Sequence, residues 1–360
     1  MEILILLFAS ASIAHISDLF FKALRIKRYQ LAKESYDPAL SVIVCAHNEE
    51  ENLKELLPIL SNQNYSNYEL ILVLDRCSDE SKKVANGFLN DQIKSLEIEQ
   101  CAEGNHPKKY GITRAIEIAR GDWMVLTDAD CRPGPNWLKE MAKGMGHDKD
   151  VVLGLSPYFK RQGFLNTIIQ YETFLTSLYF ISAAVNRKTY MALGRNVAYR
   201  KSTFIEKGGF GENIGRTGGD DDLLIQRLAT KSNVAIQISK DAHVDSISET
   251  NWDSYIRQKT RHFSVANAYT RESKRAETYR WTVHILFWAL FPVSFLINWQ
   301  LTVLIFVGSF LMKAISINIV SNALEKRFNH LWVPIVDLTY VVLFPLLSLR
   351  SLLVKRITWK

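Results

Sequence analysis

The sequence is poor in cysteine and holds no cysteine pair with the spacing that binds zinc. The 360 residues include four cysteines, and none of them forms a CxxC pair: Cys45, Cys77, Cys101 and Cys131. A structural zinc site needs closer ligand pairs or flanking histidines. Scattered single cysteines are typical of reduced, partly buried thiols in a cytosolic domain, which is the interpretation we adopt.

The chain also lacks a basic tail and a recognisable nucleic-acid motif. Its net charge of +7 suits a membrane surface with anionic lipids or an anionic substrate, so nucleic acid is not an expected partner. No glycine-rich phosphate loop follows the first apolar strand segment. A nucleotidyltransferase is therefore disfavoured, because its triphosphate substrate would need such a loop.

Long apolar runs, in contrast, lie at both ends of the chain. Residues 3–24 are long enough to span a bilayer, although His15 and Asp18 interrupt them. The run lacks the positive start and the small-residue cleavage site of a signal peptide. A basic cluster at its end places the following chain in the cytoplasm by the positive-inside tendency. We therefore expect residues 1–28 to form a transmembrane anchor.

Three further apolar runs predict transmembrane or interfacial helices within residues 281–354. They span residues 281–297, 301–320 and 331–349. The short polar turn between the first two predicts a helical hairpin. The number and orientation of the spans stay open, because three full spans put the C-terminus outside whereas its basic residues favour the inside. Lys313 and Asp337 lie in these runs and could pair, or each could face a polar environment separately.

Between residues 38 and 275, short apolar runs alternate with segments of helical spacing. Strands are predicted at 40–46, 68–75, 95–101 and within 121–130, and helices at 48–63, 78–89 and 108–119. Asn48 is a predicted N-cap, with Glu51 three residues later. Strands and helices that alternate at this length form βαβ units, so we expect an α/β domain with a mostly parallel sheet.

Polar and acidic side chains follow three of the predicted strands. They are Asn48 and Glu49, then Asp75 and Asp79, and finally Asp128 and Asp130. In open parallel sheets, ligands bind beyond the carboxyl ends of the strands. Alternate residues of a strand point the same way, so the last two carboxylates need a positive group beside them. Oxygen ligands suit magnesium or manganese, and such an ion would coordinate the diphosphate of a nucleotide.

The alternative is that these aspartates only end strands and cap helices. The surroundings of Asp128 and Asp130 favour the ligand interpretation. A loop rich in proline and glycine follows them at residues 133–135, and acids also follow two other predicted strands.

Two later segments carry further candidate groups. Three consecutive acids at residues 220–222 open a predicted helix behind two glycines, and one of them could act as a general base. The structural alternative is that they only favour the helix dipole. Arg257 and Arg261 are four residues apart on one helix face and suit a phosphate group. Their alternative is a basic face beside the membrane.

The stretch at residues 163–185 is aromatic and apolar but is interrupted by Gln170 and Glu172. We expect an amphipathic helix at the membrane interface that covers the predicted ligand site. An ordinary core helix beneath the sheet is the alternative.

Five segments in order resemble the motifs of family 2 glycosyltransferases, the membrane-embedded inverting enzymes of GT-A fold that include hyaluronan, chitin and cellulose synthases. They are SVIVCAHNEEENL, LVLDRCSDES, TDADCRP, GGDDDLLIQR and QKTRH. Each motif is weak alone, and together they extend over roughly residues 38–265. The resemblance implies a cytoplasmic GT-A catalytic domain at residues 38–275, between the membrane segments.

The resemblance also implies which residues bind the donor. Glu49 and Asp75 would contact the nucleoside, and Asp79 matches the last acid of the second motif. Asp128 would lie near the ribose and diphosphate, and Asp130 would hold Mg2+ or Mn2+. Lys108 or Lys109 would lie near the nucleotide, and Lys109 is our candidate.

For catalysis, the resemblance makes Asp221 the general base and Asp220 its neighbour. Gln258 and Arg261 match a QxxRW motif in which His262 replaces the tryptophan. Arg261, together with Arg257, would stabilise the departing diphosphate, and Gln258 would position the acceptor or the diphosphate. By the same resemblance, Asn196 would lie near the acceptor.

The implied reaction is inverting transfer of a sugar from a UDP- or GDP-sugar to a membrane-associated or lipid-linked glycan, with Mg2+ or Mn2+. A processive polysaccharide synthase stays an alternative, although the missing tryptophan disfavours it. Transfer to polyprenyl phosphate is another, disfavoured because an ionised phosphate needs little base catalysis. An aspartate-nucleophile phosphatase lacks support, since Arg132 stands where its DxDxT motif needs threonine. Asp130, Asp221 and Arg261 argue against a scaffold without activity.

Overall fold

The computed structural model describes residues 2–32, 36–326, 328 and 332–354. The chain divides into two compact units. The sheet unit comprises Gln30–Phe159 and Asn186–Ser248, and the helical unit comprises Met1–Tyr29, Lys160–Val185 and Glu249–Lys355. Residues 163–185 and 249–275, which the motifs assign to the catalytic domain, group with the helical unit.

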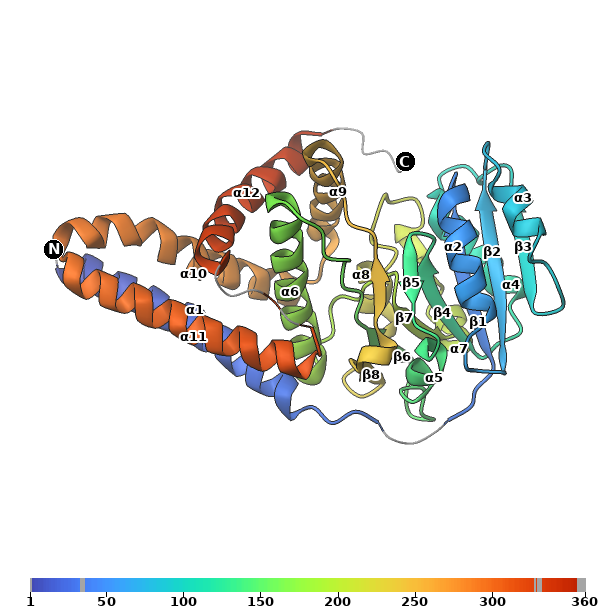
Figure 1. The fold of residues 1–360 in the computed structure, drawn as a ribbon, viewed down its shortest axis with the longest axis horizontal. Coiled ribbons are helices and arrows are strands. Elements are labelled where there is room, and N and C mark those ends of the chain that lie inside the picture. Colours follow the sequence, from blue (N-terminus) through green and yellow to red (C-terminus); the bar gives the residue numbers. More distant parts are fainter. Residues whose placement is uncertain (1, 33–35, 327, 329–331, 355–360) are drawn as a thin grey trace. The chain divides into compact units, whose positions relative to one another are not determined.

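The sheet unit is built on a seven-stranded sheet in the order β3-β2-β1-β4-β7-β6-β8 (Figure 1). Its strands are β1 (Leu40–Ala46), β2 (Tyr68–Asp75), β3 (Ile93–Ile98), β4 (Trp123–Asp128), β6 (Val151–Gly154), β7 (Val197–Arg200) and β8 (Val234–Gln237). Strand β7 is antiparallel to both neighbours, and all other pairs are parallel. A separate ribbon pairs β5 (Cys131–Pro133) with β9 (Val244–Ser246). The predicted mostly parallel sheet is confirmed.

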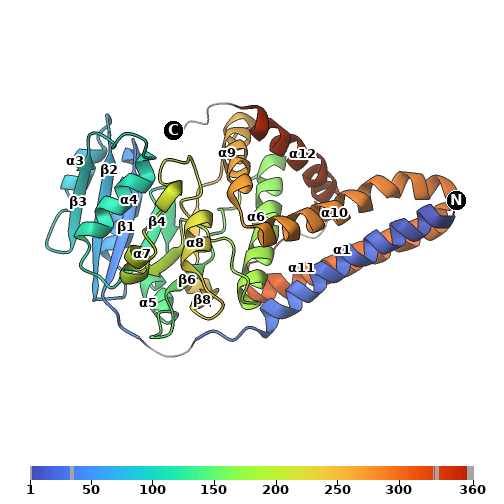
Figure 2. The same cartoon turned by 180° about the vertical axis from the view of Figure 1, so that it is seen from behind.

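Helices α2 (Glu50–Ser61) and α4 (Pro107–Ile118) cover opposite faces of the parallel half of the sheet (Figures 1 and 2). The leucines of α2 pack on the even-numbered side chains of β1 and β2. On the other face, Gly111 of α4 comes so close to Val73 that an added Cβ would lie 2.8 Å from its Cγ1. The remaining helices of the unit are α3 (Ser81–Asn86), α5 (Trp137–Ala142), α7 (Lys201–Glu206) and α8 (Asp222–Leu228).

The predicted helix cap at Asn48 is wrong. The N-cap of α2 is Glu49, and its side chain makes no capping hydrogen bond. Asn48 adopts a φ of 55°, and its Oδ1 accepts hydrogen bonds from the backbone N–H groups of Ser78 (2.7 Å) and Asp79 (3.4 Å). The residue therefore ties the loop after β1 to the loop after β2, a tertiary contact that a local capping pattern does not reveal.

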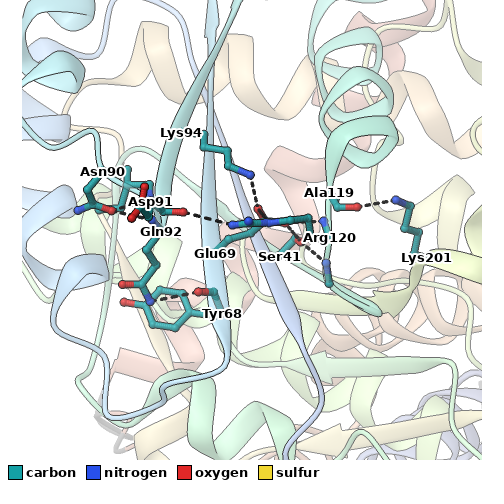
Figure 3. Close-up of polar contacts among 12 residues, drawn as sticks. Ser41, Tyr68, Glu69, Asn90, Asp91, Gln92, Lys94, Ala119, Arg120 and Lys201 are labelled. Carbon is teal, nitrogen blue, oxygen red and sulfur yellow. Dashed lines mark hydrogen bonds and ion pairs between the residues drawn. The ribbon is translucent and has the colours of Figure 1, made fainter.

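Glu69 organises the opposite, amino edge of the sheet (Figure 3). Its carboxylate is 4% exposed and accepts hydrogen bonds from Ser41 Oγ (2.7 Å), Arg120 N–H (2.5 Å) and Lys94 Nζ (3.1 Å). Burial by itself would raise the pKa of Glu69, but these donors outweigh burial and lower it to about 2. The start of β2 is thus tied to β1, β3 and the residues before β4.

Six long helices lie in the described part of the helical unit. They are α1 (Glu2–Arg28), α6 (Phe164–Val185), α9 (Trp252–Val265), α10 (Arg271–Ile297), α11 (Trp299–Ala323) and α12 (Val333–Leu353). Helices α1 and α11 run side by side in both views (Figures 1 and 2). The predicted hairpin is confirmed, since Asn298 ends α10 and its side chain caps α11. Helix α10 begins ten residues before the predicted run at 281.

Five of the described helices are long and apolar enough to cross a membrane: α1, α6, α10, α11 and α12. Large apolar side chains of these helices are widely exposed, among them Leu6, Leu296, Leu304 and Leu346. Such exposure is costly in water and normal in lipid, so the chain has the features of a membrane protein. The first residue of the predicted 331–349 run lies outside the described residues.

A fully buried carboxylate, Asp337 on α12, joins the helices of this unit. Its Oδ1 accepts hydrogen bonds from Tyr171 OH and Lys313 Nζ. Its Oδ2 accepts from Trp288 Nε1 (2.9 Å) and contacts His284 Nε2 (3.1 Å). The sequence left open whether Lys313 and Asp337 pair, and the structure pairs them.

Candidate active site

The carboxyl ends of β1, β2 and β4 meet at one edge of the sheet, here called the carboxyl edge. In the parallel register, Ala46 lies opposite Leu74 and Cys45 lies opposite Asp128. The polar side chains that follow these strands are therefore brought to the same edge, where open α/β sheets bind ligands.

Lys108 supplies the positive charge that the paired aspartates require. It lies in the first turn of α4, with its Nζ 2.9 Å from Asp128 Oδ1 and 2.8 Å from Asp220 Oδ2. The three side chains are 15%, 34% and 18% exposed, so they are shielded but still reachable from solvent. One ammonium group thus joins the acid at the end of β4 to the acid that precedes α8.

This ion pair separates the protonation of the two neighbouring aspartates. Burial alone would lower the pKa of Lys108, but Asp128 and Asp220 raise it well above its ordinary value. At Asp220, Lys108 outweighs burial and holds the pKa of the carboxyl below its usual range. At Asp221, burial and then the Asp220 carboxylate raise the pKa. Asp221 is therefore the more basic carboxylate, which suits a general base.

Backbone N–H groups hold the Asp221 side chain at the start of α8. Its Oδ1 accepts a hydrogen bond from Asp222 N–H (2.8 Å), and its Oδ2 accepts one from Gly194 N–H (3.1 Å). A Cβ on Gly194 would lie only 3.2 Å from that of Asp221, so a glycine permits this approach. Gly218 and Gly219 precede the acids with φ of 77° and 70°, in the left-handed region that favours glycine.

Asp75, the last residue of β2, is buried at the carboxyl edge. It forms a two-point ion pair with Arg76, whose Nε and NH2 lie 2.8 and 2.9 Å from the two carboxylate oxygens. The backbone carbonyl of Asp75 lies 2.6 Å from His47 Nδ1. A ligand that uses this carboxylate would therefore share it with Arg76.

Asp79 and Glu49 are engaged with nearby groups. Asp79 accepts hydrogen bonds from the backbone N–H groups of Glu50 (3.1 Å) and Ser81 (3.0 Å), so it supports the first turns of α2 and α3. Glu49 accepts one from Asn52 Nδ2 (2.7 Å). Asp79 thus has the helix-supporting role that was the alternative to ligand binding. A contact between Asp79 and a nucleotide would come in addition to these hydrogen bonds.

The hydrogen bonds of the Lys109 ammonium go to backbone carbonyls rather than to the carboxylates that Lys108 joins. Its Nζ donates to the backbone carbonyls of Asn213 (2.6 Å) and Arg216 (2.9 Å). Burial lowers the pKa of Lys109 to about 8. Of the two candidate lysines, Lys108 is thus the one in direct contact with the acids, and Lys109 fixes the loop that leads to them.

Asn196, expected near the acceptor, has its side chain engaged in the protein core. Its side chain is fully buried and donates to the backbone carbonyls of Leu155 (2.6 Å) and Ala242 (2.8 Å). Its Oδ1 accepts a hydrogen bond from Trp137 Nε1 (3.0 Å). These partners occupy the amide within the core and leave it no face toward a substrate.

Asp130 follows Asp128 at the same edge, is half-buried, and has a positive group nearby that sequence reasoning missed. The charge of Arg195 acts on both Asp130 and Asp128. Its guanidinium donates to Ser156 Oγ (2.6 Å) and Tyr158 OH (2.9 Å), which fix its position. No local motif marks Arg195, because both partners come from the segment after β6, distant in sequence.

The chemistry of the carboxyl edge fits a magnesium or manganese ion. Asp128 and Asp130 offer carboxylate oxygens at the end of β4, and both remain partly accessible. Hard cations of this kind use few protein ligands and complete their coordination with water and phosphate oxygens. Asp130 would hold the ion, because Asp128 already shares its charge with Lys108.

The third group of candidates lies on α9 of the helical unit. Arg257 is exposed, while Gln258 and Arg261 are half-buried. Gln258 Nε2 lies 3.3 Å from Glu249 Oε1 at the start of the same segment. The acids belong to the sheet unit, so the cooperation of α9 with them stays a prediction.

The fold belongs to a known class of transferase. It resembles a solved mannosyltransferase from Pyrobaculum calidifontis, determined in complex with GDP-Man and Mn2+, with a TM-score of 0.60 and 16% sequence identity. The likeness covers 96% of this chain and 99% of the other. It establishes the GT-A glycosyltransferase fold, flanked by apolar helices.

The family follows from the sequence match. Residues 41–207 match the family model described as "Glycosyl transferase family 2". Over these residues, slightly under half of the chain, the protein is similar to glycosyltransferase family 2, and the resemblance found from the motifs is confirmed. The matched segment includes the strand-end acids and Lys108 and ends before the acids at 220–222.

Curated relatives are similar over part of their length. The glucosyl-dolichyl phosphate glucuronosyltransferase of Haloferax volcanii is 24% identical over 193 residues, which cover 50% of this chain and 58% of the relative. The glycosyltransferase AglE of the same organism is 31% identical over 106 residues, or 28% and 34% of the two chains. The chain thus spans between a third and three fifths of these relatives.

Proposed function

We propose that the protein is an inverting, metal-dependent glycosyltransferase that moves a sugar from a nucleotide sugar to a hydroxyl of a lipid-linked or membrane-associated glycan. The observation that carries the proposal is the position of Lys108 between Asp128 and Asp220. It brings the acids of two separate motifs to one edge, beside a carboxylate of raised pKa, Asp221. The groups proposed to bind the donor and to accept the proton are thereby neighbours.

The donor diphosphate would be held by groups of both signs. A Mg2+ or Mn2+ ion at Asp130 would act as a Lewis acid on the leaving diphosphate when bound. Lys108 and Arg195 would limit the repulsion between phosphate and the acids. Asp75, paired with Arg76, and Glu49 would contact the nucleoside. The solved neighbour binds GDP-Man with Mn2+, and a GDP- or UDP-sugar is the donor class we expect here.

Asp221 would accept the proton of the acceptor hydroxyl. As the proton passes to its carboxylate, the acceptor oxygen forms the new bond to the anomeric carbon, and the bond to the diphosphate oxygen breaks on the opposite face. Configuration at that carbon inverts. Arg261 and Arg257 would stabilise the departing diphosphate, and Gln258 would position the acceptor or the diphosphate.

The acceptor assignment rests on the apolar helices and on one relative. Five helices able to span a bilayer keep the chain where a lipid-linked sugar would be presented. The Haloferax volcanii relative is named for glucosyl-dolichyl phosphate, a lipid-linked sugar. We place the sheet unit on the cytoplasmic side, because basic residues end α1: Arg25, Lys27 and Arg28.

The test is nucleotide release from UDP- and GDP-sugars by the detergent-solubilised full chain, with Mn2+ or with chelator, with and without lipid-linked acceptors. We expect acceptor- and metal-dependent release from one donor class. Asp221→Asn should lower it by roughly 10²–10⁴-fold, as loss of a general base does. The control Asp91→Asn, at an exposed acid of the same unit, should change nothing. Undiminished release by Asp221→Asn would refute the base assignment.

A further inference from the structure

Helix α9 has two chemically different sides. Tyr255 and Lys259 are buried, at 0% and 6% exposure, and lie one turn apart. Arg257, Gln258 and Arg261, the candidate catalytic side chains, are exposed or half-buried. A lysine is rarely buried unless it is paired, so the buried side of this helix must have a specific partner.

The partner is Glu172 of α6, which is 8% exposed. Its Oε1 accepts a hydrogen bond from Lys259 Nζ, and its Oε2 accepts one from Tyr255 OH (3.1 Å). One carboxylate therefore binds two donors on successive turns of α9. The function proposed above gives Glu172 no role, and the sequence marks it only as a polar interruption of an apolar stretch.

A two-point contact of this kind fixes both the rotation and the axial position of α9. Successive residues of an α-helix are turned by about 100°, so a rotation by one residue would bring Gln258 to the position of Lys259. Apolar contacts alone tolerate small rotations of a helix, because they are not directional. Two hydrogen bonds to the two oxygens of one carboxylate are directional, so a rotation of α9 would break them.

Helix α6 is itself fixed next to this contact. Tyr171, adjacent to Glu172, donates its hydroxyl hydrogen to Asp337 Oδ1 of α12. Phe263 of α9 packs on Phe344 of α12, with ring centroids 5.4 Å apart. The carboxylate that holds α9 thus stands on a helix whose own position is set by a buried hydrogen bond.

We propose that Glu172 is a positioning residue: through Lys259 and Tyr255 it sets the orientation in which α9 presents Gln258 and Arg261. The proposal rests on the function proposed above, because those two side chains are the groups that it positions. It deepens that function by assigning to α6 a role in turnover beyond that of an apolar helix.

The informative variant is the double substitution Glu172→Met with Lys259→Met. Each single change would leave a buried charge without its partner and would damage folding. The double change removes both charges at similar volume, and we expect a melting temperature in detergent close to that of the parent protein. We expect kcat to fall at least tenfold, with a smaller change in donor KM. Lys259→Arg, which keeps the charge, should retain more of kcat than the double variant.

The control is a matched double change at an exposed pair of the sheet unit, Glu97→Met with Lys82→Met, which should leave kcat unaltered. Hydrogen exchange provides a readout that needs no activity. The amides of residues 252–265 should exchange faster in the double variant, while those of α12 stay protected. Parent-like kcat in a folded double variant would overturn the proposal. Parent-like protection of α9 would overturn it even if no sugar transfer were found, whereas absent transfer in the parent protein would count against the proposed function alone.

Discussion

The two units of this protein pair their shielded charged side chains in opposite ways. At the carboxyl edge of the sheet, one ammonium, Lys108, serves two carboxylates. In the helical unit, one carboxylate, Asp337, collects the side chains of Tyr171, His284, Trp288 and Lys313. The first arrangement leaves negative charge uncompensated, and the second leaves none.

The solvent exposure of these charged side chains also differs between the two units. The residues joined by Lys108 are 18–34% exposed, whereas Lys313 and Asp337 are 3% and 0% exposed. Asp221 adds a further carboxylate near Lys108, and Asp130 follows Asp128 at the same edge. An accessible, negatively charged edge can attract a cation and its phosphate ligand, whereas a closed, neutral pair holds helices together. The difference suits the binding role proposed for the carboxyl edge and a structural role for Asp337.

The buried group around Asp337 has the ligand types of a metal site but already contains a lysine. Ligand atoms of His15, His284 and Asp337 lie within 4.8 Å of one another, and among the described residues no other such group of three occurs. The Lys313 ammonium contacts Asp337 and lies 3.4 Å from His15 Nε2. A protein cation therefore already occupies the place that a metal ion would take.

The largest effect should come from opening the closed pair. Asp337→Leu leaves Lys313 without its counter-ion, and removal of one partner of a buried pair costs about 3–5 kcal/mol. We expect loss of monodisperse protein in detergent, measured by size-exclusion chromatography and thermal melting. Adding Lys313→Met should restore much of the stability, and the exposed Arg271→Met should be neutral. An Asp337→Leu protein that melts at the same temperature as the parent would contradict the structural role of the Asp337–Lys313 pair.

Glu69 provides a second closed carboxylate, this time within the sheet unit. Its pKa is lowered to about 2 in the fold, so its stabilisation is complete above the ordinary glutamate value of about 4.3 and is lost as pH falls toward 2. We expect Glu69→Gln to cost about 2–3 kcal/mol at neutral pH, a figure set by that pKa difference. Chemical denaturation at pH 7 and pH 3 measures it, and the deficit should be smaller at pH 3. A constant deficit would contradict the ionic explanation.

Lys108→Met should leave the fold intact and change binding. Without the ammonium, the acids are more negative, so Mn2+ should bind the nucleotide-free protein severalfold more tightly, as measured by electron paramagnetic resonance. Sugar transfer should fall roughly 10–100-fold, because the diphosphate then faces uncompensated carboxylates. The neighbouring Lys109→Met, which loosens a loop instead, should not tighten Mn2+ binding. Weaker Mn2+ binding by Lys108→Met would show that the edge is not an open acidic site.

The smallest effect concerns pH. As the proposed general base, Asp221 would have to be deprotonated, and its pKa is raised, so kcat should decline on the acid side at a pH above the ordinary aspartate value. Asp220→Asn removes a carboxylate that helps to raise this pKa. The acid limb of the kcat profile should therefore move to lower pH, by less than about one unit. A limb that moves upward would exclude Asp221 as its source.

Much of the fold could be predicted from local sequence. β1 and β2 coincide with the predicted 40–46 and 68–75, because both are short apolar runs bounded by turns. The cap at Asn48 was wrong because its amide found partners in another loop. The start of α10 was missed because its first turns, from Arg271, are polar and the prediction followed hydropathy alone.

The candidate site was predictable only as a set of residue types. The strand-end position of Asp128 and the general-base role expected of an acid near 221 follow from pattern and family resemblance. The choice of Lys108 over Lys109, and the use of Asn196 in the core, depended on where α4 and β7 lie. Arg195 had no signal, since its partners are assembled from other segments.

The sequence by itself determined the alternation of the first four strands with three helices, the acids at the strand ends and the apolar helices, because alternation, helical period and run length are local properties. Only the tertiary structure decided which charges meet. A lysine, an aspartate or a glutamate carries the same charge anywhere in the chain, and whether it binds a ligand, holds a helix or orients a motif depends on the neighbours and the burial that folding provides.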